Sequence, residues 1–216
     1  MPEFELVICV VNSGHGSKVL KIAKNYGIRG GTICMGTGLV HNRLLEFLDL
    51  DDIRREIVFM ATEKEIAGTV TQGLNKEMAF RKPNHGIVFS VPIECLYGTQ
   101  ICGDNNRSEN KVVENTMFSA IFTVVDRGIG EDVVDASKEA GARGATIIHA
   151  RGSGIHETEM LFAMQIEPEK DMVLILAKSE MCDDIISSIR NRINIDDPGT
   201  GIIFTLGINN AYGLST

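Results

Sequence analysis

The chain has 216 residues, of which 44% are hydrophobic, and a formal net charge of −8 at pH 7. This length and apolar content are typical of a globular protein with one or two packed domains. The negative charge argues against non-specific nucleic-acid binding, which needs a basic surplus to neutralise phosphates, and against a polybasic membrane anchor.

The cysteines indicate a reducing compartment. Five are present, and they form neither a CxxC pair nor a zinc-binding spacing: Cys9, Cys34, Cys95, Cys102 and Cys182. Small buried thiols in a reduced protein are the simplest interpretation. The first residues lack the cationic start and the long apolar run of a signal peptide, and no stretch approaches the length of a membrane span. We therefore predict a cytoplasmic protein.

The N-terminal half alternates short apolar runs with helical spacings of apolar residues. These patterns predict a strand at 4–11, a helix at 17–26, strands at 32–35 and 56–61, a helix at 62–80 and a strand at 87–93. Gly27 is a natural stop for the first helix, and Thr62 with Glu65 has the spacing of a capping box for the second. The segment 41–52 fits a short helix or a loop.

A polar segment, 99–116, is the predicted linker to a second half with the same order of elements. The patterns there predict a strand at 118–125, a helix that ends at Gly141, strands at 146–150 and 172–177, a helix at 179–193 and a strand at 202–206. Ser179 is the expected N-cap of the last helix, whose isoleucines recur along one face.

The two halves are copies of one pattern. The sequence GIRGGTICMGTG, residues 27–38, recurs as GARGATIIHARGSG, residues 141–154, and Tyr97-Gly98 recurs as Tyr212-Gly213. A repeat of this length indicates two copies of one structural unit. Each has the order β-α-β-β-α-β, which predicts an α+β protein with tandem ferredoxin-like domains and antiparallel sheets, at 1–98 and 117–216. The sheet face opposite the helices should be covered by another sheet.

Glycine pairs follow the second predicted strand of each half, at Gly36 to Gly38 and at Gly152 to Gly154. Two interpretations stay open: tight turns, or backbone N–H groups presented to an anion. Arg151, beside the second pair, either binds a phosphate or carboxylate or has no specific partner. Neither place matches a dinucleotide-binding or P-loop fingerprint.

No metal or catalytic site is predicted. His149, His156, Glu157 and Glu159 surround one loop, but a third well-spaced nitrogen or sulfur ligand is missing. No Ser/His/Asp or Cys/His arrangement can be recognised in the sequence. We therefore predict that the protein is not an enzyme.

Three motifs on this topology resemble those of the P-II nitrogen-regulatory signalling family, in a tandem form. They are the glycine pairs, Glu167-Pro168-Glu169-Lys170 before the third strand, and Pro198-Gly199-Thr200-Gly201 before the last strand. The resemblance covers both halves except the linker. It implies a trimeric, non-enzymatic sensor that binds adenine nucleotides, and often 2-oxoglutarate, in clefts between neighbouring domains.

The resemblance also implies a signalling loop between strands two and three, which docks on a membrane transporter or a metabolic enzyme. These loops would be 36–55 and 151–169 here. The residues expected at the ligand, which would be ATP, ADP, AMP or 2-oxoglutarate with no covalent cofactor, are Gly36, Thr37, Gly38, Arg151, Gly152, Ser153, Gly154, Gly199, Thr200 and Gly201. Those expected at the partner are His156, Glu157 and Glu159. The expected assembly is a homotrimer of two-domain chains.

The sequence departs from the family pattern in three respects. Ile87 and Ile202 stand where a lysine is expected after the phosphate-binding loop, Asn209, Asn210 and Tyr212 replace an arginine pair, and the signalling loops contain no tyrosine for uridylylation. Two other functions stay open on the same topology. They are a tandem pair of ACT-like domains that senses amino acids, and an enzyme or metal-handling protein.

Overall fold

The structure is a computed structural model that describes residues 3–39, 52–82, 85–98, 117–154, 160–161, 164–165, 167–209 and 211. Contacts between residues divide the chain into two compact units. The N-terminal unit is Glu5–Val91, and the C-terminal unit is Pro92–Thr216 together with Met1–Phe4. The predicted linker, 99–116, lies outside the described residues.

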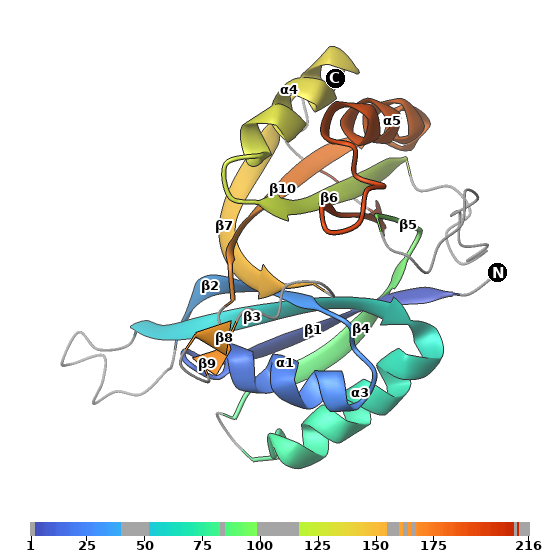
Figure 1. Ribbon diagram of the computed structural model, residues 1–216. Helices are drawn as coiled ribbons and strands as arrows, with labels where there is room; N and C mark the ends of the chain where they lie inside the picture. Colours follow the sequence, from blue (N-terminus) through green and yellow to red (C-terminus); the bar gives the residue numbers. More distant parts are fainter. Residues whose placement is uncertain are drawn as a thin grey trace. The chain divides into compact units, whose positions relative to one another are not determined.

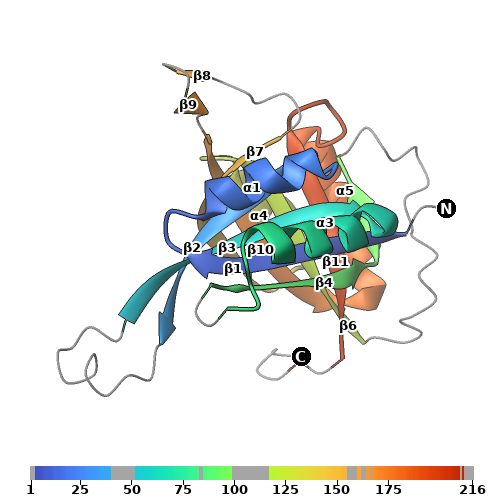
Figure 2. The ribbon, with the colours of Figure 1, turned by 90° about the horizontal axis from the view of Figure 1, so that it is seen from below.

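The N-terminal unit has four strands and two helices among its described residues. In chain order they are β1 (Phe4–Asn12), α1 (Gly16–Asn25), β2 (Gly31–Leu39), β3 (Asp52–Glu63), α3 (Lys64–Glu77) and β4 (Ile87–Ile93). The strands lie side by side in the order β4-β1-β3-β2. Both helices cover the same face of this sheet, where they contact each other (Figures 1 and 2).

The C-terminal unit repeats this design, adds one strand to the sheet and contains a separate hairpin. Its elements are β5 (Cys95–Tyr97), β6 (Phe118–Asp126), α4 (Gly130–Glu139), β7 (Ala145–Ser153), β8 (Met160–Leu161), β9 (Met164–Gln165), β10 (Glu169–Lys178), the 3₁₀-helix η1 (Ser179–Met181), α5 (Cys182–Ile193) and β11 (Gly201–Ile208). The main strands have the order β7-β10-β6-β11-β5. The pair β8–β9 is a separate two-stranded hairpin inside the predicted second signalling loop.

The two units therefore share one topology, and the prediction of tandem ferredoxin-like units is confirmed. Strand by strand, the order β4-β1-β3-β2 corresponds to β11-β6-β10-β7. The registers agree as well, because Thr32 opposes Phe59 in one unit and Thr146 opposes Leu174 in the other. The offset between the copies is 114 residues before the signalling loop and 115 after it.

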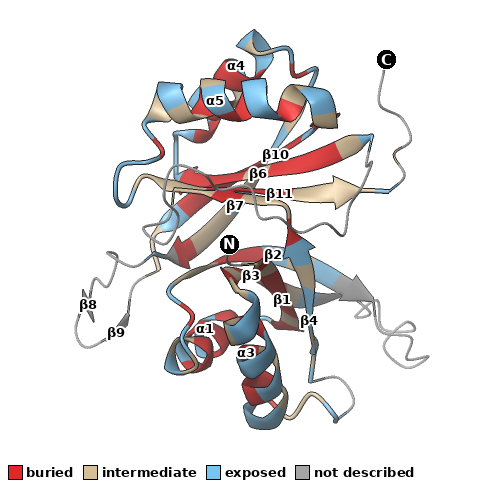
Figure 3. Cartoon of the chain, turned by 90° about the vertical axis from the view of Figure 1, so that its right-hand side faces the viewer, coloured by how far each residue is buried: buried red, intermediate tan, exposed pale blue. Residues whose placement is uncertain are grey.

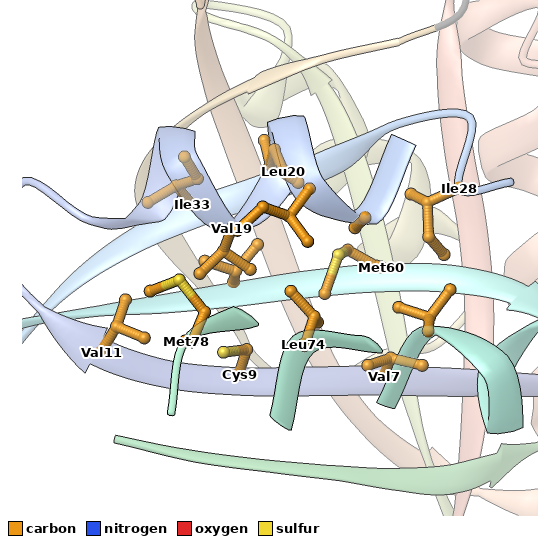
Figure 4. Close-up of a cluster of buried hydrophobic side chains, with 14 of the residues drawn as sticks. Val7, Cys9, Val11, Val19, Leu20, Ile28, Ile33, Met60, Leu74 and Met78 are labelled. Carbon is orange, nitrogen blue, oxygen red and sulfur yellow. The ribbon is translucent and has the colours of Figure 1, made fainter. Parts of the chain in front are cut away.

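Each unit has its own core between helices and sheet. In the N-terminal unit, Val7, Cys9 and Val11 of β1 alternate toward α1 and α3, where Val19 and Leu74 meet them (Figure 4). In the C-terminal unit, Val173 and Ile175 of β10 are packed in the same way against α4 and α5. Figure 3 shows the buried residues of the helices on the sides that face the sheets. Strand alternation places the intervening residues on the opposite face of each sheet.

Two local predictions were wrong. No capping box starts α3, since its N-cap is Glu63 and no side chain caps it. Ser179 is not the N-cap of α5 either, because η1 intervenes and the N-cap is Met181. Gly73 lies buried inside α3. A Cβ added there would lie 2.4 Å from the ring of Tyr26, so close packing explains this glycine.

The strand β5 was not predicted. One residue after β4, the chain pairs Cys95–Tyr97 antiparallel with β11, so this segment lies with the C-terminal unit. The contact-based division falls between Val91 and Pro92 and thus differs from the predicted domain boundary at residue 98. The domain boundaries themselves remain a prediction.

Candidate functional site

The predicted glycine loops are continuous strands. Gly36 and Gly38 lie in β2, opposite Arg55 and Ile53 of β3. Gly152 lies in β7, and its N–H donates to the carbonyl oxygen of Pro168 at 3.0 Å. None of these three is among the described glycines with positive φ. The prediction that each second strand ends before its glycine pair was wrong, because cross-strand pairing continues through the glycines.

The two glycine pairs are also not equivalent. In the register that the sheets establish, Gly36 corresponds to Ala150, which opposes Lys170, as Gly36 opposes Arg55. Gly38 corresponds to Gly152. The pairs are thus displaced by two residues relative to each other, and only one glycine of each pair shares a position.

Arg151 extends from β7 and already has an acidic partner. Its Nε donates to Oε2 of Glu167 at 2.7 Å, and the Glu167 side chain is only 8% exposed. An anionic ligand would have to compete with this carboxylate. Thr37 lies in β2 opposite Arg54, Ser153 ends β7 and Gly154 follows it. The predicted docking residues His156, Glu157 and Glu159 lie outside the described residues, as do residues 40–51 of the first loop.

The loop Pro198–Gly201 before β11 is closed by its own backbone. The N–H of Thr200 donates to the carbonyl oxygen of Asp197 at 3.2 Å. Gly199 is exposed with φ +89°, and no atom lies within 4 Å of an added Cβ. Gly201 is different, since an added Cβ would lie 2.3 Å from the carbonyl oxygen of Val124. Of the three glycine motifs, this loop alone presents an exposed glycine in a positive-φ turn.

A polar cluster at the start of α4 was not predicted. Its centre is Asp171 of β10, which is 4% exposed. The Asp171 carboxylate accepts hydrogen bonds from the backbone N–H of Gly128 at 2.8 Å and from Nδ1 of His149 at 3.0 Å, and Nε of Arg127 lies 3.8 Å away. Burial alone raises the pKa of Asp171, but these donors and charges outweigh it and hold the pKa below its ordinary value.

The N-terminal unit contains the counterpart of this carboxylate. Glu56 of β3 is 2% exposed, and its Oε2 accepts a hydrogen bond from the N–H of Gly16 at 2.6 Å. Neither α1 nor α4 has a side-chain cap from its own N-cap residue. The sequence holds the signal, because EIVFMATE, 56–63, and DMVLILAK, 171–178, both begin with an acid followed by apolar residues.

Ion pairs surround this end of the C-terminal sheet. Nζ of Lys170 lies 2.6 Å from Oδ1 of Asp126, and NH1 of Arg127 lies 3.4 Å from Oε2 of Glu169. In the N-terminal unit, Arg55 donates to Asn12 at the positions equivalent to Lys170 and Asp126. The cations here are thus held by protein partners, and chemistry that needs an uncompensated cation would require one of these pairs to open.

Searches for two other kinds of site gave negative results within the described ranges. No group of three or more histidine, cysteine, aspartate or glutamate side chains is placed to hold a metal ion there. Among the described helices, none has the length and apolar character needed to cross a membrane.

Comparisons with known proteins show what the C-terminal unit is similar to. The profile of the family described as "Nitrogen regulatory protein P-II" matches residues 118–216. A search of curated proteins gave no match. Among solved structures, Arabidopsis thaliana PII bound to citrate is 20% identical, with a TM-score of 0.36, over 46% of this chain and 82% of that one.

Two further solved structures are similar to parts of the chain. The B. subtilis GlnK–ATP complex is 16% identical, with a TM-score of 0.35, over 46% of this chain and 88% of that one. The ligand-free regulatory subunit of aspartate kinase from Thermus thermophilus is 12% identical, with a TM-score of 0.36, over 88% and 92% of the two chains. The profile match spans the whole described β-α-β-β-α-β order of the C-terminal unit, from β6 to β11. The C-terminal unit thus matches the P-II family profile over its residues 118–216.

Proposed function

We propose that the protein is a cytoplasmic, non-enzymatic sensor that binds a small anionic effector and regulates a partner protein. The effector is an adenine nucleotide in the first place and a 2-oxo acid such as 2-oxoglutarate in the second. The observation that supports this proposal is the family match over residues 118–216, on a unit with the ferredoxin-like strand order. The N-terminal unit acts as a second sensor domain of the same kind.

In the C-terminal unit, the effector site includes the exposed loop Pro198–Gly201 and the segment around Gly152 and Gly154. Support comes from the open space beside Gly199, which lets a phosphate approach the backbone closely. The proposed set there is completed by Arg151, Gly152, Ser153, Gly154, Thr200 and Gly201. The proposed residues of the N-terminal unit are Gly36, Thr37 and Gly38. Arg151 exchanges Glu167 for the ligand, so binding also releases the segment before β10 that carries Glu167.

The affinity is low because the expected lysine is missing. Ile202 is half-buried after the loop, and Ile87, its counterpart, is 57% exposed. A charge-assisted hydrogen bond contributes on the order of 1.5–3 kcal/mol. The loss of one such hydrogen bond per site weakens binding roughly ten- to a hundredfold, since each 1.4 kcal/mol changes the dissociation constant by a factor of about ten. Micromolar dissociation constants are the expected best case.

The protein regulates its partner through the loops between the second and third strands of each unit. Residues such as His156, Glu157 and Glu159 dock on a membrane transporter or a metabolic enzyme. An effector changes this docking only if it binds the two loop states unequally. The assembly is a homotrimer, as expected for the family.

Isothermal titration calorimetry with ATP, ADP, AMP, 2-oxoglutarate and the common amino acids tests the proposal. We expect heat with at least one nucleotide. A Thr200→Val variant should bind that nucleotide at least fivefold more weakly, because it loses a hydroxyl donor at the loop. Thr69→Val, a matched change on the exposed face of α3, should leave binding unchanged.

Two results would contradict the proposal. The first is the absence of heat with every nucleotide at millimolar concentration. The second is binding of an amino acid with no response to nucleotides, which would favour the ACT-like function. Equal binding by Thr200→Val would remove the Pro198–Gly201 loop from the site.

A further inference from the structure

The helix α1 carries a row of lysines. Lys18, Lys21 and Lys24 follow one another at intervals of three residues, so neighbouring members lie one helical turn apart. Lys18 and Lys21 are exposed, and Lys24 is half-buried. We call these three residues the lysine stripe. The first turn of α1 contains no acidic residue, so Lys18 places a positive charge near the positive end of the helix dipole.

The C-terminal unit has the opposite charge at two of these positions. With the offset of 114 residues, Lys18 corresponds to Asp132 and Lys21 to Asp135 of α4. Lys24 alone has a lysine as its counterpart, and in both helices this lysine lies in the last turn, where the dipole favours a cation. The dipole therefore accounts for Lys24 but not for Lys18 and Lys21.

The buried carboxylates at the helix starts do not explain the difference either. Glu56 accepts a hydrogen bond from the N–H of Gly16 at 2.6 Å, and Asp171 accepts one from the N–H of Gly128 at 2.8 Å. Each unit thus already has one such carboxylate. Even so, α4 adds two acidic residues of its own in the first turn, and α1 adds none.

The acidic residues of α4 have cations beside them. Nη2 of Arg192 on α5 donates to Oε1 of Glu139 at 2.5 Å. This hydrogen bond, with smaller contributions from Asp132 and Asp135, raises the pKa of Arg192 above its ordinary value. Oδ1 of Asp135 also lies 4.0 Å from Nζ of Lys138. The negative charge of α4 is therefore partly balanced within its own unit.

The lysine stripe is less well balanced. Within the described ranges, the side chains of Lys18 and Lys21 form no ion pair and no hydrogen bond. Glu77 of α3 stands at the position of Arg192, and its carboxylate accepts a hydrogen bond from the Tyr26 hydroxyl at 2.8 Å. Like charges one helical turn apart repel each other. An arrangement that costs stability in its own unit indicates that another molecule uses it.

We propose that the lysine stripe is a docking surface for an acidic segment of a partner protein. Its charge is complementary to such a segment. The stripe is confined to α1, because α3, which contacts α1, carries two lysines and two glutamates and is neutral overall. A bilayer or a nucleic-acid duplex presents anions over a broader area and repels a chain with a net charge of −8. An acidic segment can lie along a single helix.

Fluorescence anisotropy with a fluorescein-labelled peptide of six glutamates tests the proposal. No nucleotide is present, so the result is independent of the proposed effector. We expect binding at about 20 mM NaCl that weakens at least threefold at about 150 mM, where the Debye length is only about 8 Å. Lys18→Asp combined with Lys21→Asp should weaken binding at least fivefold. This variant gives α1 the charges that α4 has at the same positions, so its melting temperature should not fall.

The matched control is Lys138→Asp combined with Lys178→Asp. Both are exposed lysines of the C-terminal unit, and the net charge changes by the same amount. This control should bind the peptide within twofold of wild type. Equal weakening in the two double variants would mean that net charge alone governs binding and would overturn the proposal. No binding of the peptide at millimolar concentration would overturn it as well.

Two further measurements test other occupants of the stripe. Vesicles of phosphatidylserine and phosphatidylcholine should not sediment the wild-type protein. Vesicle binding that Lys18→Asp with Lys21→Asp removes would assign the stripe to a membrane instead. In sedimentation equilibrium, the same double variant should keep the wild-type mass. A lower mass would assign the stripe to a contact between copies of this chain, and either result would overturn the proposal.

Discussion

Glu56 and Asp171 show what a single repeated residue contributes to this fold. Each is buried on the third strand of its unit and accepts a hydrogen bond from a backbone N–H at the start of the first helix. A negative charge at a helix N-terminus is stabilised by the helix dipole, and a buried carboxylate requires such partners. Glu56 therefore caps the first N–H of α1 from the sheet, and Asp171 holds the turn that leads into α4.

We predict that Asp171→Asn destabilises the C-terminal unit at neutral pH by about 1.5–3 kcal/mol, the contribution of a hydrogen bond to a charged group. The folded pKa lies below the ordinary value of 3.8, so the charged form stabilises the fold. That contribution is complete well above pH 3.8 and is lost as the pH falls through the folded pKa. Urea denaturation at pH 7 and at pH 3 measures both effects.

The difference between wild type and Asp171→Asn should therefore shrink as the pH is lowered from 7 to 3. Asp135→Asn is the matched control, since the Asp135 side chain is 66% exposed and its ion pair with Lys138 is long, at 4.0 Å. This control should change the free energy of unfolding by less than about 0.5 kcal/mol. A pH-independent loss for Asp171→Asn would show that the side chain matters through its shape alone.

At the scale of elements, the sequence predicts what depends on local periodicity. All eight main strands and the four main helices exist where apolar spacing places them, and Gly27 and Gly141 follow helix ends with φ +101° and +94°. Strand ends were less predictable. β2 and β7 continue through their glycines because β3 and β10 offer hydrogen-bonding partners. The sequence of one segment alone does not indicate that such a partner strand will lie beside it.

The candidate site was predictable only in part, for the same reason. The loop Pro198–Gly201 has a local signature, and the sequence predicts it as a loop before the last strand. The cluster around Asp171 joins Arg127, His149 and the α4 N-terminus, which are up to 44 residues apart in the chain. The correspondence of Asp171 to Glu56 is recognised only when the two copies are aligned with each other. Similarly, β5 has three residues, too few for a periodicity to appear.

We predict that the ring of Tyr97 anchors β5. It lies 5.0 Å from the guanidinium carbon of Arg190, and burial, with smaller contributions from Cys95 and Asp183, raises the pKa of Tyr97 to about 12. A cation–π contact at a partly exposed site contributes about 0.5–1 kcal/mol. Tyr97→Leu should therefore speed hydrogen exchange at the Glu94 and Cys95 amides roughly two- to fivefold.

The change should be confined to this strand. Tyr26→Leu, a matched substitution in the N-terminal unit, should leave exchange at those two amides unaltered, because Tyr26 packs on Gly73 and bonds Glu77 instead. Unchanged protection in Tyr97→Leu would mean that the backbone bonds to Thr205 hold β5 without the ring.

At the scale of the whole molecule, the sheet faces opposite the helices are apolar. Ile57 and Phe59 alternate with core residues Val58 and Met60 of β3, and both are half-buried. Across the C-terminal unit, Leu176 of β10 lies on the corresponding face and is 38% exposed. Apolar area of this kind marks interfaces between chains. It supports the expectation that the chain functions as an oligomer.

We predict a solution mass of about 71 kDa, three times 23.6 kDa, by sedimentation equilibrium at micromolar concentration. Leu176→Asp should lower this mass, because burying an unpaired carboxylate in an apolar interface is costly. Ile129→Asp is the matched control. Ile129 is 37% exposed, but it precedes α4 and lies away from that face. The mass of this variant should therefore stay at three chains. A wild-type mass of one chain would refute the trimer, and loss of mass in both variants would place the interface elsewhere.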